Sequence, residues 1–148
     1  KIDRVACAWL INRFVDTDAK FLFVAPSQVL NVSEKYKAIP FDIEDTFWGH
    51  RDQKCTFDTM LEEFELNITA LKQIARIIRA ADINKLNLVP EANGLLAISL
   101  GLSRMYKNDL EQIQAGNSAE ATRTIGLLLD VLNQPPNSTI ISTTKINE

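Results

Sequence analysis

The sequence has 148 residues, of which 46% are hydrophobic, and this is enough for one domain with a continuous core. Its 16 basic and 19 acidic residues give a net charge of -3, so the strong basic bias of a nucleic-acid-binding domain is missing. Direct contact of this segment with nucleic acid is therefore not expected. The two cysteines form neither a CxxC pair nor a disulfide framework, which favours a reducing compartment.

The hydropathy pattern excludes a membrane-spanning helix. No apolar run approaches the roughly 18 to 20 residues that cross a bilayer, and no signal-peptide pattern opens the sequence. We expect a cytoplasmic protein without a membrane partner. Because Lys1 already lies inside a helical pattern, a removed signal peptide or a preceding domain stays open.

The first third of the sequence predicts helices that alternate with short strands. Residues 2–14 place apolar side chains at mostly three- and four-residue intervals, which is typical of a helix. Residues 20–24 (KFLFV) and 38–43 (AIPFDI) have the composition of short strands, and residues 26–36 begin with a proline that can start a helix. Strand, helix and strand in this order predict one βαβ unit with parallel strands.

The remaining two thirds predict helices alone, with Thr56 as the cap of the first. They cover residues 57–66, 70–82, 91–106, a short stretch from Asp109, and 118–132. We therefore expect a predominantly helical α+β fold, with about six helices around a small two- or three-stranded sheet. Residues 1–133 are predicted to form a single domain, and residues 134–148 a tail that is either an edge strand or disordered.

One short stretch, GHRDQKCTFDTMLEE, concentrates groups that bind metal ions. It holds His50, the only histidine, followed by Cys55, Asp58 and Glu62, which fall within a narrow arc of the predicted helix. Asp42 would emerge beyond the carboxyl end of the second strand, where ligands bind in open α/β sheets. Imidazole, thiolate and carboxylate ligands together suit zinc, iron or manganese. Simpler interpretations stay open, because the helix dipole favours early acidic residues and Cys55 can be a small buried hydrophobe.

A second group of candidate residues is basic. Arg79 shares a helix face with Arg76, whereas Arg4 and Arg51 lie near a helix end or in a loop. Guanidinium groups bind tetrahedral oxyanions well, so these side chains are candidate anion ligands. The alternative is a set of structural salt bridges. Their predicted acidic partners are then Asp3, Asp82, Glu91 and the acidic helix.

Several separated motifs also resemble a known family. The motifs IDRVACAWLINRF, FLFV, PFDIEDTFWGH, CTFD, IIRAAD, PEANGL and SLGLSRMY follow an order similar to that in the C-terminal domain of the chromate-resistance protein ChrB family. The resemblance runs from about Ile2 to Gly116. It implies a bacterial protein linked to chromate resistance, whose longer relatives are chromate-responsive regulators with this domain as the sensing or core module. By position, the family pattern points to Asp3, Arg4, Trp9, Arg13, Asp42, His50, Cys55, Asp58, Arg79, Asp82 and Glu91.

These observations predict a chromate-resistance-associated binding or sensory domain. We expect its polar pocket to hold a divalent metal ion. Binding of an oxyanion such as chromate stays open, and no organic cofactor is indicated. Cys55 is the redox-sensitive candidate if its thiolate is accessible. The alternative is a metal-dependent hydrolase or oxidoreductase of chromate or oxidative-stress detoxification, in which Glu62 or Glu63 handles protons. A homodimer and a purely structural salt-bridge network also stay open, and no catalytic residue is assigned.

Overall fold

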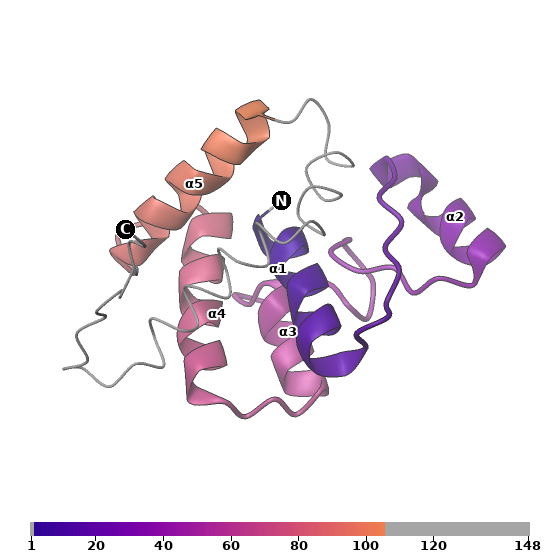
Figure 1. Ribbon diagram of the computed structural model, residues 1–148, viewed down its shortest axis with the longest axis horizontal. Coiled ribbons are helices and arrows are strands. Elements are labelled where there is room, and N and C mark those ends of the chain that lie inside the picture. The colour runs from indigo at the N-terminus through magenta and orange to yellow at the C-terminus, as the bar shows by residue number, and fades with distance from the viewer. Residues whose placement is uncertain (1, 106–148) are drawn as a thin grey trace, which may run out of the picture.

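The computed structural model describes residues 2–105, which form a helical fold (Figure 1). The predicted helices from Asp109 onward and the predicted tail lie outside the described residues. Each of the other predicted helices is confirmed, with shifts of a few residues at the ends. Residues 2–105 contain the α-helices α1 (Ile2–Leu10), α2 (Val29–Tyr36), α3 (Thr56–Glu63), α4 (Thr69–Asp82) and α5 (Glu91–Met105). A π-helical turn, Ile11–Val15, continues α1, and a 3-10 turn, Pro26–Gln28, precedes α2.

The predicted α+β fold is wrong, because residues 2–105 contain isolated backbone bridges but no β-strand or sheet. The first predicted strand meets the second through an edge-to-face contact of Phe21 with Phe41, whose ring centroids are 6.1 Å apart. Phe41 forms a single parallel bridge with Trp48. Pro40 has no N–H to donate, and Asp42 has a positive φ of 57° that ends the extended run. Aromatic packing therefore replaces the expected βαβ unit.

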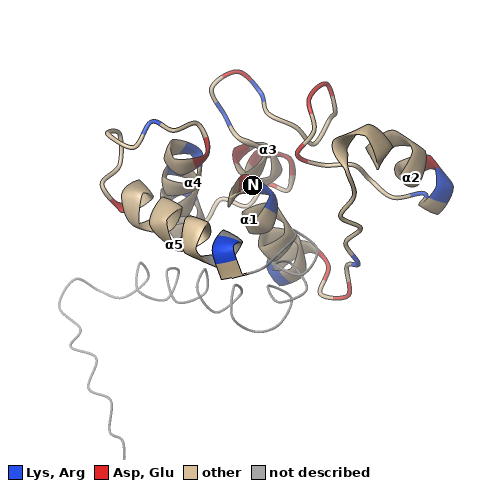
Figure 2. Ribbon diagram, turned by 90° about the horizontal axis from the view of Figure 1, so that it is seen from above, with Lys and Arg blue, Asp and Glu red and all other residues tan. Residues whose placement is uncertain are grey.

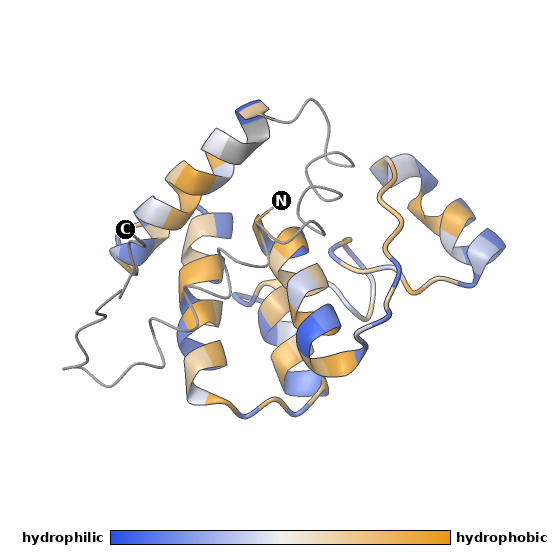
Figure 3. Ribbon diagram, in the orientation of Figure 1, coloured by the Kyte–Doolittle hydropathy of each residue, from blue (hydrophilic) through white to orange (hydrophobic). Residues whose placement is uncertain are grey.

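Helices α1, α3 and α4 form the centre of the fold, each packed on the other two, and α5 packs on α4 (Figure 1). Figure 3 shows apolar segments on all of these helices. The largest fully buried apolar side chains of this core are Leu10, Phe57, Met60 and Leu71. Burying each of them contributes about 1.5–3 kcal/mol, so core packing fixes how the three central helices are placed.

Helix α2 stands apart from the other helices (Figures 1 and 2), and its main packing partner is its own 3-10 turn. Its Leu30 and Tyr36 are 69% and 59% exposed. The side chains considered below therefore come from α1, α3, α4 and the loop between α2 and α3. None of the described helices combines the length and apolar character required to span a membrane.

Candidate metal centre

Asp3 is fully buried in the first turn of α1 and joins that helix to α3. Its carboxylate accepts hydrogen bonds from the backbone N–H groups of Thr56, at 2.7 Å, and Phe57, at 2.9 Å. The first N–H groups of a helix have no partner within the helix and carry partial positive charge, so a carboxylate stabilises them. The sequence predicted Thr56 as the cap of this helix. Thr56 is instead its first residue, and Asp3 supplies the acceptor from 53 residues away.

His50 brings three carboxylates together. Its Nε2 atom lies 3.2 Å from Asp3 Oδ2, 3.7 Å from Asp42 Oδ1 and 3.6 Å from Asp82 Oδ2. One ligand atom from each of Asp3, His50 and Asp82 lies within 4.8 Å of the other two. Figure 2 looks onto the N-terminus of α1 and shows acidic segments around this end of the central helices. We call these four residues the carboxylate–histidine cluster.

The cluster concentrates negative charge around the buried Asp3 carboxylate. Burial raises the pKa of Asp3 above its ordinary value; the N–H groups of Phe57 and Thr56 oppose this effect, and the charges of Asp42 and Asp82 add to it. Arg4 offsets part of the charge, because its Nε donates to Asp42 Oδ2 at 2.9 Å. A cation bound between the carboxylates would stabilise their charged forms.

Two buried contacts hold the loop that carries His50. Thr59 on α3 is buried, and its hydroxyl donates to the backbone carbonyl of Gly49 at 2.9 Å. A Cβ atom at Gly49 would lie only 2.5 Å from the carbonyl oxygen of Ile43, so the close approach of the two backbone segments requires glycine here. Gly49, the residue before His50, is thus held by contacts on both sides. A tightly packed loop therefore positions the imidazole beside the three carboxylates.

Cys55 and Asp58 form a separate pair at the start of α3. Asp58 Oδ2 accepts from the backbone N–H of Cys55 at 3.1 Å and from its thiol at 3.3 Å, and Arg79 Nη1 donates to Asp58 Oδ1 at 3.0 Å. Burial raises the pKa of the Cys55 thiol well above its ordinary value, and the charges of Asp3 and Asp58 raise it further. A redox sensor or metal ligand requires the thiolate, which this environment opposes.

The structure therefore divides the predicted metal ligands. His50 and Asp42 lie in the carboxylate–histidine cluster, whereas Cys55 and Asp58 form the neighbouring pair. Glu62 lies on the surface and pairs with Lys54.

The predicted anion ligands are engaged by carboxylates. Arg4 pairs with Asp42, Arg79 with Asp58, and Arg51 with Glu63. The guanidinium of Arg51 also stacks on the Phe47 ring, with 4.9 Å from Cζ to the ring centroid. Asp58 and Glu63 belong to the acidic helix that the salt-bridge alternative named, whereas Asp42 was not among its predicted partners. Of the predicted acidic pocket residues, Asp3 and Asp82 join the cluster, and Glu91 is exposed in the first turn of α5.

Sequence reasoning named Asp3 and Asp82 as pocket residues but not as metal ligands. A signal for each was present. Asp3 is an acidic residue on a helix of otherwise mostly apolar residues, and Asp82 lies at a helix C-terminus, where the dipole disfavours negative charge. A negative charge at either position is unfavourable unless a cation lies beside it, so both positions predicted a cationic partner. No comparable signal pointed to Thr59.

Comparison with known proteins identifies the family. Residues 1–119 match the family described as ChrB, C-terminal domain. The sequence is also 32% identical, over 109 residues, to Protein ChrB of Cupriavidus metallidurans (strain ATCC 43123 / DSM 2839 / NBRC 102507 / CH34). That match covers 73% of this chain and 32% of the relative, so the chain spans about a third of the relative's length. No solved structure matches. The chain belongs to the ChrB C-terminal domain family, which confirms the resemblance to this chromate-resistance family.

Proposed function

We propose that this domain is a divalent-cation-binding module of a chromate-resistance protein, with Asp3, His50 and Asp82 as the ligands. The observation that carries the proposal is the convergence of their ligand atoms within 4.8 Å at a buried carboxylate. Family membership supports the link to chromate resistance. A cytoplasmic location and the absence of nucleic-acid contact stay predictions.

The distances from His50 Nε2 to the carboxylate oxygens fit an ion of transition-metal size. Nitrogen and carboxylate ligands bind zinc at about 2.0–2.2 Å, so a tetrahedral ion separates its ligand atoms by about 3.4 Å. The nearest carboxylate oxygens of Asp3, Asp82 and Asp42 lie 3.2, 3.6 and 3.7 Å from His50 Nε2. One imidazole with two or three carboxylates suits zinc, iron or manganese. Asp42 is the natural additional ligand, since it faces the same nitrogen atom.

Chromate enters this proposal through the cation. Arg4, Arg51 and Arg79 each pair with a carboxylate, so an oxyanion bound by them would have to compete with existing ion pairs. In our proposal the oxyanion binds as a ligand of the cation on its solvent side, where the His50 side chain is 44% exposed. In our proposal chromate, or a product of its reduction, changes the occupancy or ligands of this cation. Catalytic roles stay unassigned.

Metal analysis of purified protein tests the proposal. Protein purified without added metal is dialysed against EDTA, reloaded with Zn²⁺ or Mn²⁺, and desalted before elemental analysis. Wild type should retain about one ion per chain, and His50→Ala and Asp82→Asn should retain at least ten times less. The matched control is Asp52→Asn, which removes an exposed carboxylate from the same loop. The proposal fails if wild type retains no stoichiometric ion, or if the two variants retain as much metal as the control.

Calorimetric titration tests the chromate step separately. Metal-loaded wild type should give saturable heat with chromate that metal-free protein and the sulfate titration do not give. Equal, negligible heats in all three titrations would remove the chromate step from the proposal.

A further inference from the structure

Helix α5 differs from an ordinary surface helix, because its exposed side is mostly apolar. Ala92 is fully buried and Leu95 packs against the core, so these residues attach α5 to the rest of the fold. Among the exposed residues of α5 from Gly94 onward, only Arg104 is polar. A helix on the surface of a protein normally has polar residues on its exposed side. An exposed apolar side therefore indicates a partner.

Five residues make up this apolar surface, which we call the outer face of α5. At 100° per helical residue they fall within an arc of about 100°. They are Gly94, Ala97, Ile98, Gly101 and Met105. Ile98 and Met105 are 45% and 73% exposed. Figure 1 shows α5 at the edge of the described fold, where α4 is its main packing partner.

The two glycines of the outer face indicate that this partner packs closely. Glycine is a poor helix former, so a glycine inside a helix lowers the stability of that helix. Neither Gly94 nor Gly101 has a positive φ, and a Cβ atom at either position would meet no atom of the described residues within 4 Å. Nothing within residues 2–105 therefore requires glycine here. Two glycines about two turns apart allow the backbone of another segment to come close.

The chain itself contains a candidate partner. Residues 106–148 lie outside the described residues and continue directly from Met105, the last residue of the outer face. The sequence predicts a helix over residues 118–132, and its apolar residues at helical intervals would form one stripe. They are Ala121, Ile125, Leu128, Leu129 and Leu132. Its charged residues fall on the opposite side, so this predicted helix is amphipathic and needs an apolar surface to pack against.

Length and connection favour this segment over a second copy of the chain. Helix α5 and the predicted helix over 118–132 have equal lengths, about 22 Å each at 1.5 Å per residue. Residues 106–117 between them exceed the usual two to eight residues of a helix-helix connection, so the chain has room to reverse direction. A tethered segment also has an effective concentration of roughly millimolar order, which a second copy does not reach in dilute solution.

We propose that residues 118–132 pack as an amphipathic helix along the outer face of α5 and run antiparallel to it. Gly94 and Gly101 let the two backbones approach, and Ile98 and Met105 pack against the apolar stripe of the segment. Because the chain reverses direction, residue 132 then lies near the start of α5 and residue 118 near its end.

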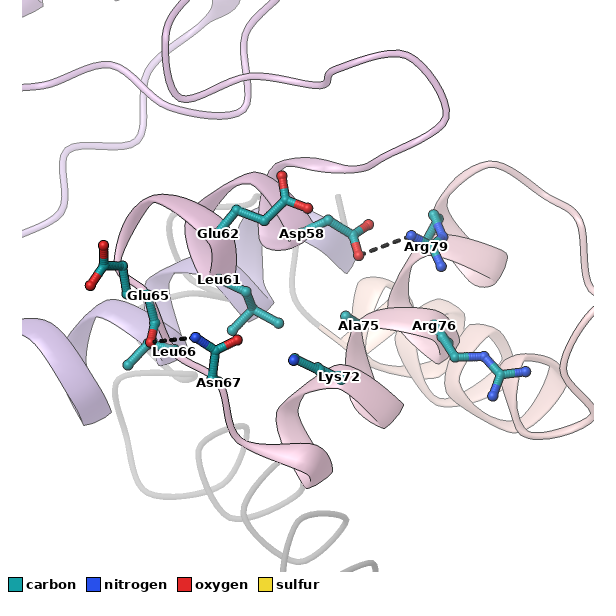
Figure 4. Close-up of a pocket in the computed structure, with 10 residues that line it drawn as sticks. All are labelled: Asp58, Leu61, Glu62, Glu65, Leu66, Asn67, Lys72, Ala75, Arg76 and Arg79. Carbon is teal, nitrogen blue, oxygen red and sulfur yellow. Dashed lines mark hydrogen bonds and ion pairs between the residues drawn. The ribbon is translucent and has the colours of Figure 1, made fainter.

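Two other surfaces fit this segment less well. The hollow between α3 and α4 (Figure 4) offers no free apolar face, because its Leu61 and Ala75 are already buried and its Asp58 and Arg79 pair with each other. Helix α2 has exposed apolar residues, but with eight residues it is about half as long as the segment. The outer face of α5 matches the segment in both length and apolar character.

Paramagnetic relaxation enhancement in the ¹⁵N-labelled full chain tests the proposal. A nitroxide label on Asn93→Cys, at the start of α5 and beside the outer face, should broaden the amides of residues 128–132 more than those of residues 118–122. The matched control carries the label on Lys35→Cys, an exposed position of α2, and should leave both ranges unbroadened. EDTA is present throughout, so the result does not depend on the proposed cation site.

A double leucine variant tests the role of the glycines. Gly94→Leu/Gly101→Leu fills the space above the outer face, so it should at least halve the broadening and lower the urea midpoint of the full chain by about 0.5 M or more. If nothing packed there, the better helix former would leave the midpoint unchanged or raise it. The control Gln73→Leu, at an exposed position of α4, should change neither the broadening nor the midpoint.

A mixed sample separates this segment from a second copy as the occupant. It contains ¹⁵N-labelled wild type without nitroxide and unlabelled Asn93→Cys with nitroxide, and residues 118–132 should stay sharp in it. Equally strong broadening in the mixed sample would assign the outer face to a second copy and overturn the inference. The inference also fails if the label on Asn93→Cys broadens none of these residues, or if Gly94→Leu/Gly101→Leu keeps or raises the urea midpoint.

Discussion

Replacement of Asp3 by alanine should destabilise the packing of α1 against α3 more than replacement of an exposed acidic residue does. The side chain accepts two buried backbone N–H groups, at 2.7 and 2.9 Å. Hydrogen bonds to charged groups contribute about 1.5–3 kcal/mol each. Relief of burial and of repulsion from Asp42 and Asp82, which raise the pKa of Asp3, offsets part of this loss. We expect Asp3→Ala to lower the free energy of unfolding by about 2–4 kcal/mol.

Urea denaturation followed by circular dichroism measures this change, and EDTA keeps metal binding out of the result. With an m-value of about 1–3 kcal/mol/M, the midpoint should fall by about 0.7–4 M. Asp3→Asn retains one acceptor oxygen and should lose roughly half as much. The control Asp18→Ala removes an exposed carboxylate and should change the free energy of unfolding by less than about 0.5 kcal/mol.

The reasoning would be refuted by an Asp3→Ala variant as stable as the control. That result would mean that the two α3 N–H groups find other acceptors, or that the buried charge costs as much as its hydrogen bonds contribute. If Asp3→Ala fails to fold, the Asp3→Asn variant and its intermediate loss decide the question.

Three further predictions follow from other contacts. Gly49→Ala places a Cβ atom 2.5 Å from a backbone carbonyl oxygen, so it should lower stability by about 1–3 kcal/mol in thermal denaturation; unchanged stability would contradict the tight loop packing. Arg79→Ala leaves the mostly buried Asp58 carboxylate without its guanidinium and should lower the free energy of unfolding by about 1–3 kcal/mol in urea denaturation. Lys54→Ala removes an exposed ion pair and should lower it by less than about 1 kcal/mol. Equal losses in the two variants would contradict the stronger role of the Arg79–Asp58 pair. Native Cys7 and Cys55 should resist Ellman's reagent at pH 8, because both are fully buried and burial raises the pKa of both thiols. Both should react in 6 M urea. Rapid release of two equivalents of thionitrobenzoate from native protein would contradict this structure.

Helical periodicity predicted the part of the fold that depends on local pattern. Residues 2–14 and 70–82 place apolar side chains on one face, and they form α1 with its π-helical turn and α4. The strand predictions failed because aromatic composition favours extended backbone without specifying a partner strand. Residues 38–43 contain a proline and reach a left-handed residue at Asp42, so the backbone makes one bridge and turns.

The candidate site was predictable only in part, because its ligands come from distant segments. His50 stands out as the only histidine. Asp42 does lie near it, but it was predicted there from a βαβ unit that residues 2–105 do not contain. The position of Asp3 depends on the packing of α1 against the start of α3, 53 residues away. Spacing rules cannot reveal that contact, because they relate residues along one helix, such as Cys55, Asp58 and Glu62, but not residues of two helices and a loop. Helical spacing accordingly grouped Glu62 with Asp58, whereas the structure pairs it with Lys54.

The single histidine permits the most direct test of the proposed cation site. One imidazole gives one pair of side-chain ¹⁵N resonances, which a long-range ¹H–¹⁵N correlation spectrum detects without assignment of other residues. On titration of metal-free protein with Zn²⁺, the Nε2 resonance of His50 should shift and saturate at about one equivalent, and Asp82→Asn should abolish saturation at that ratio. Unchanged imidazole ¹⁵N resonances at saturating Zn²⁺ would contradict the assignment of His50 as a metal ligand.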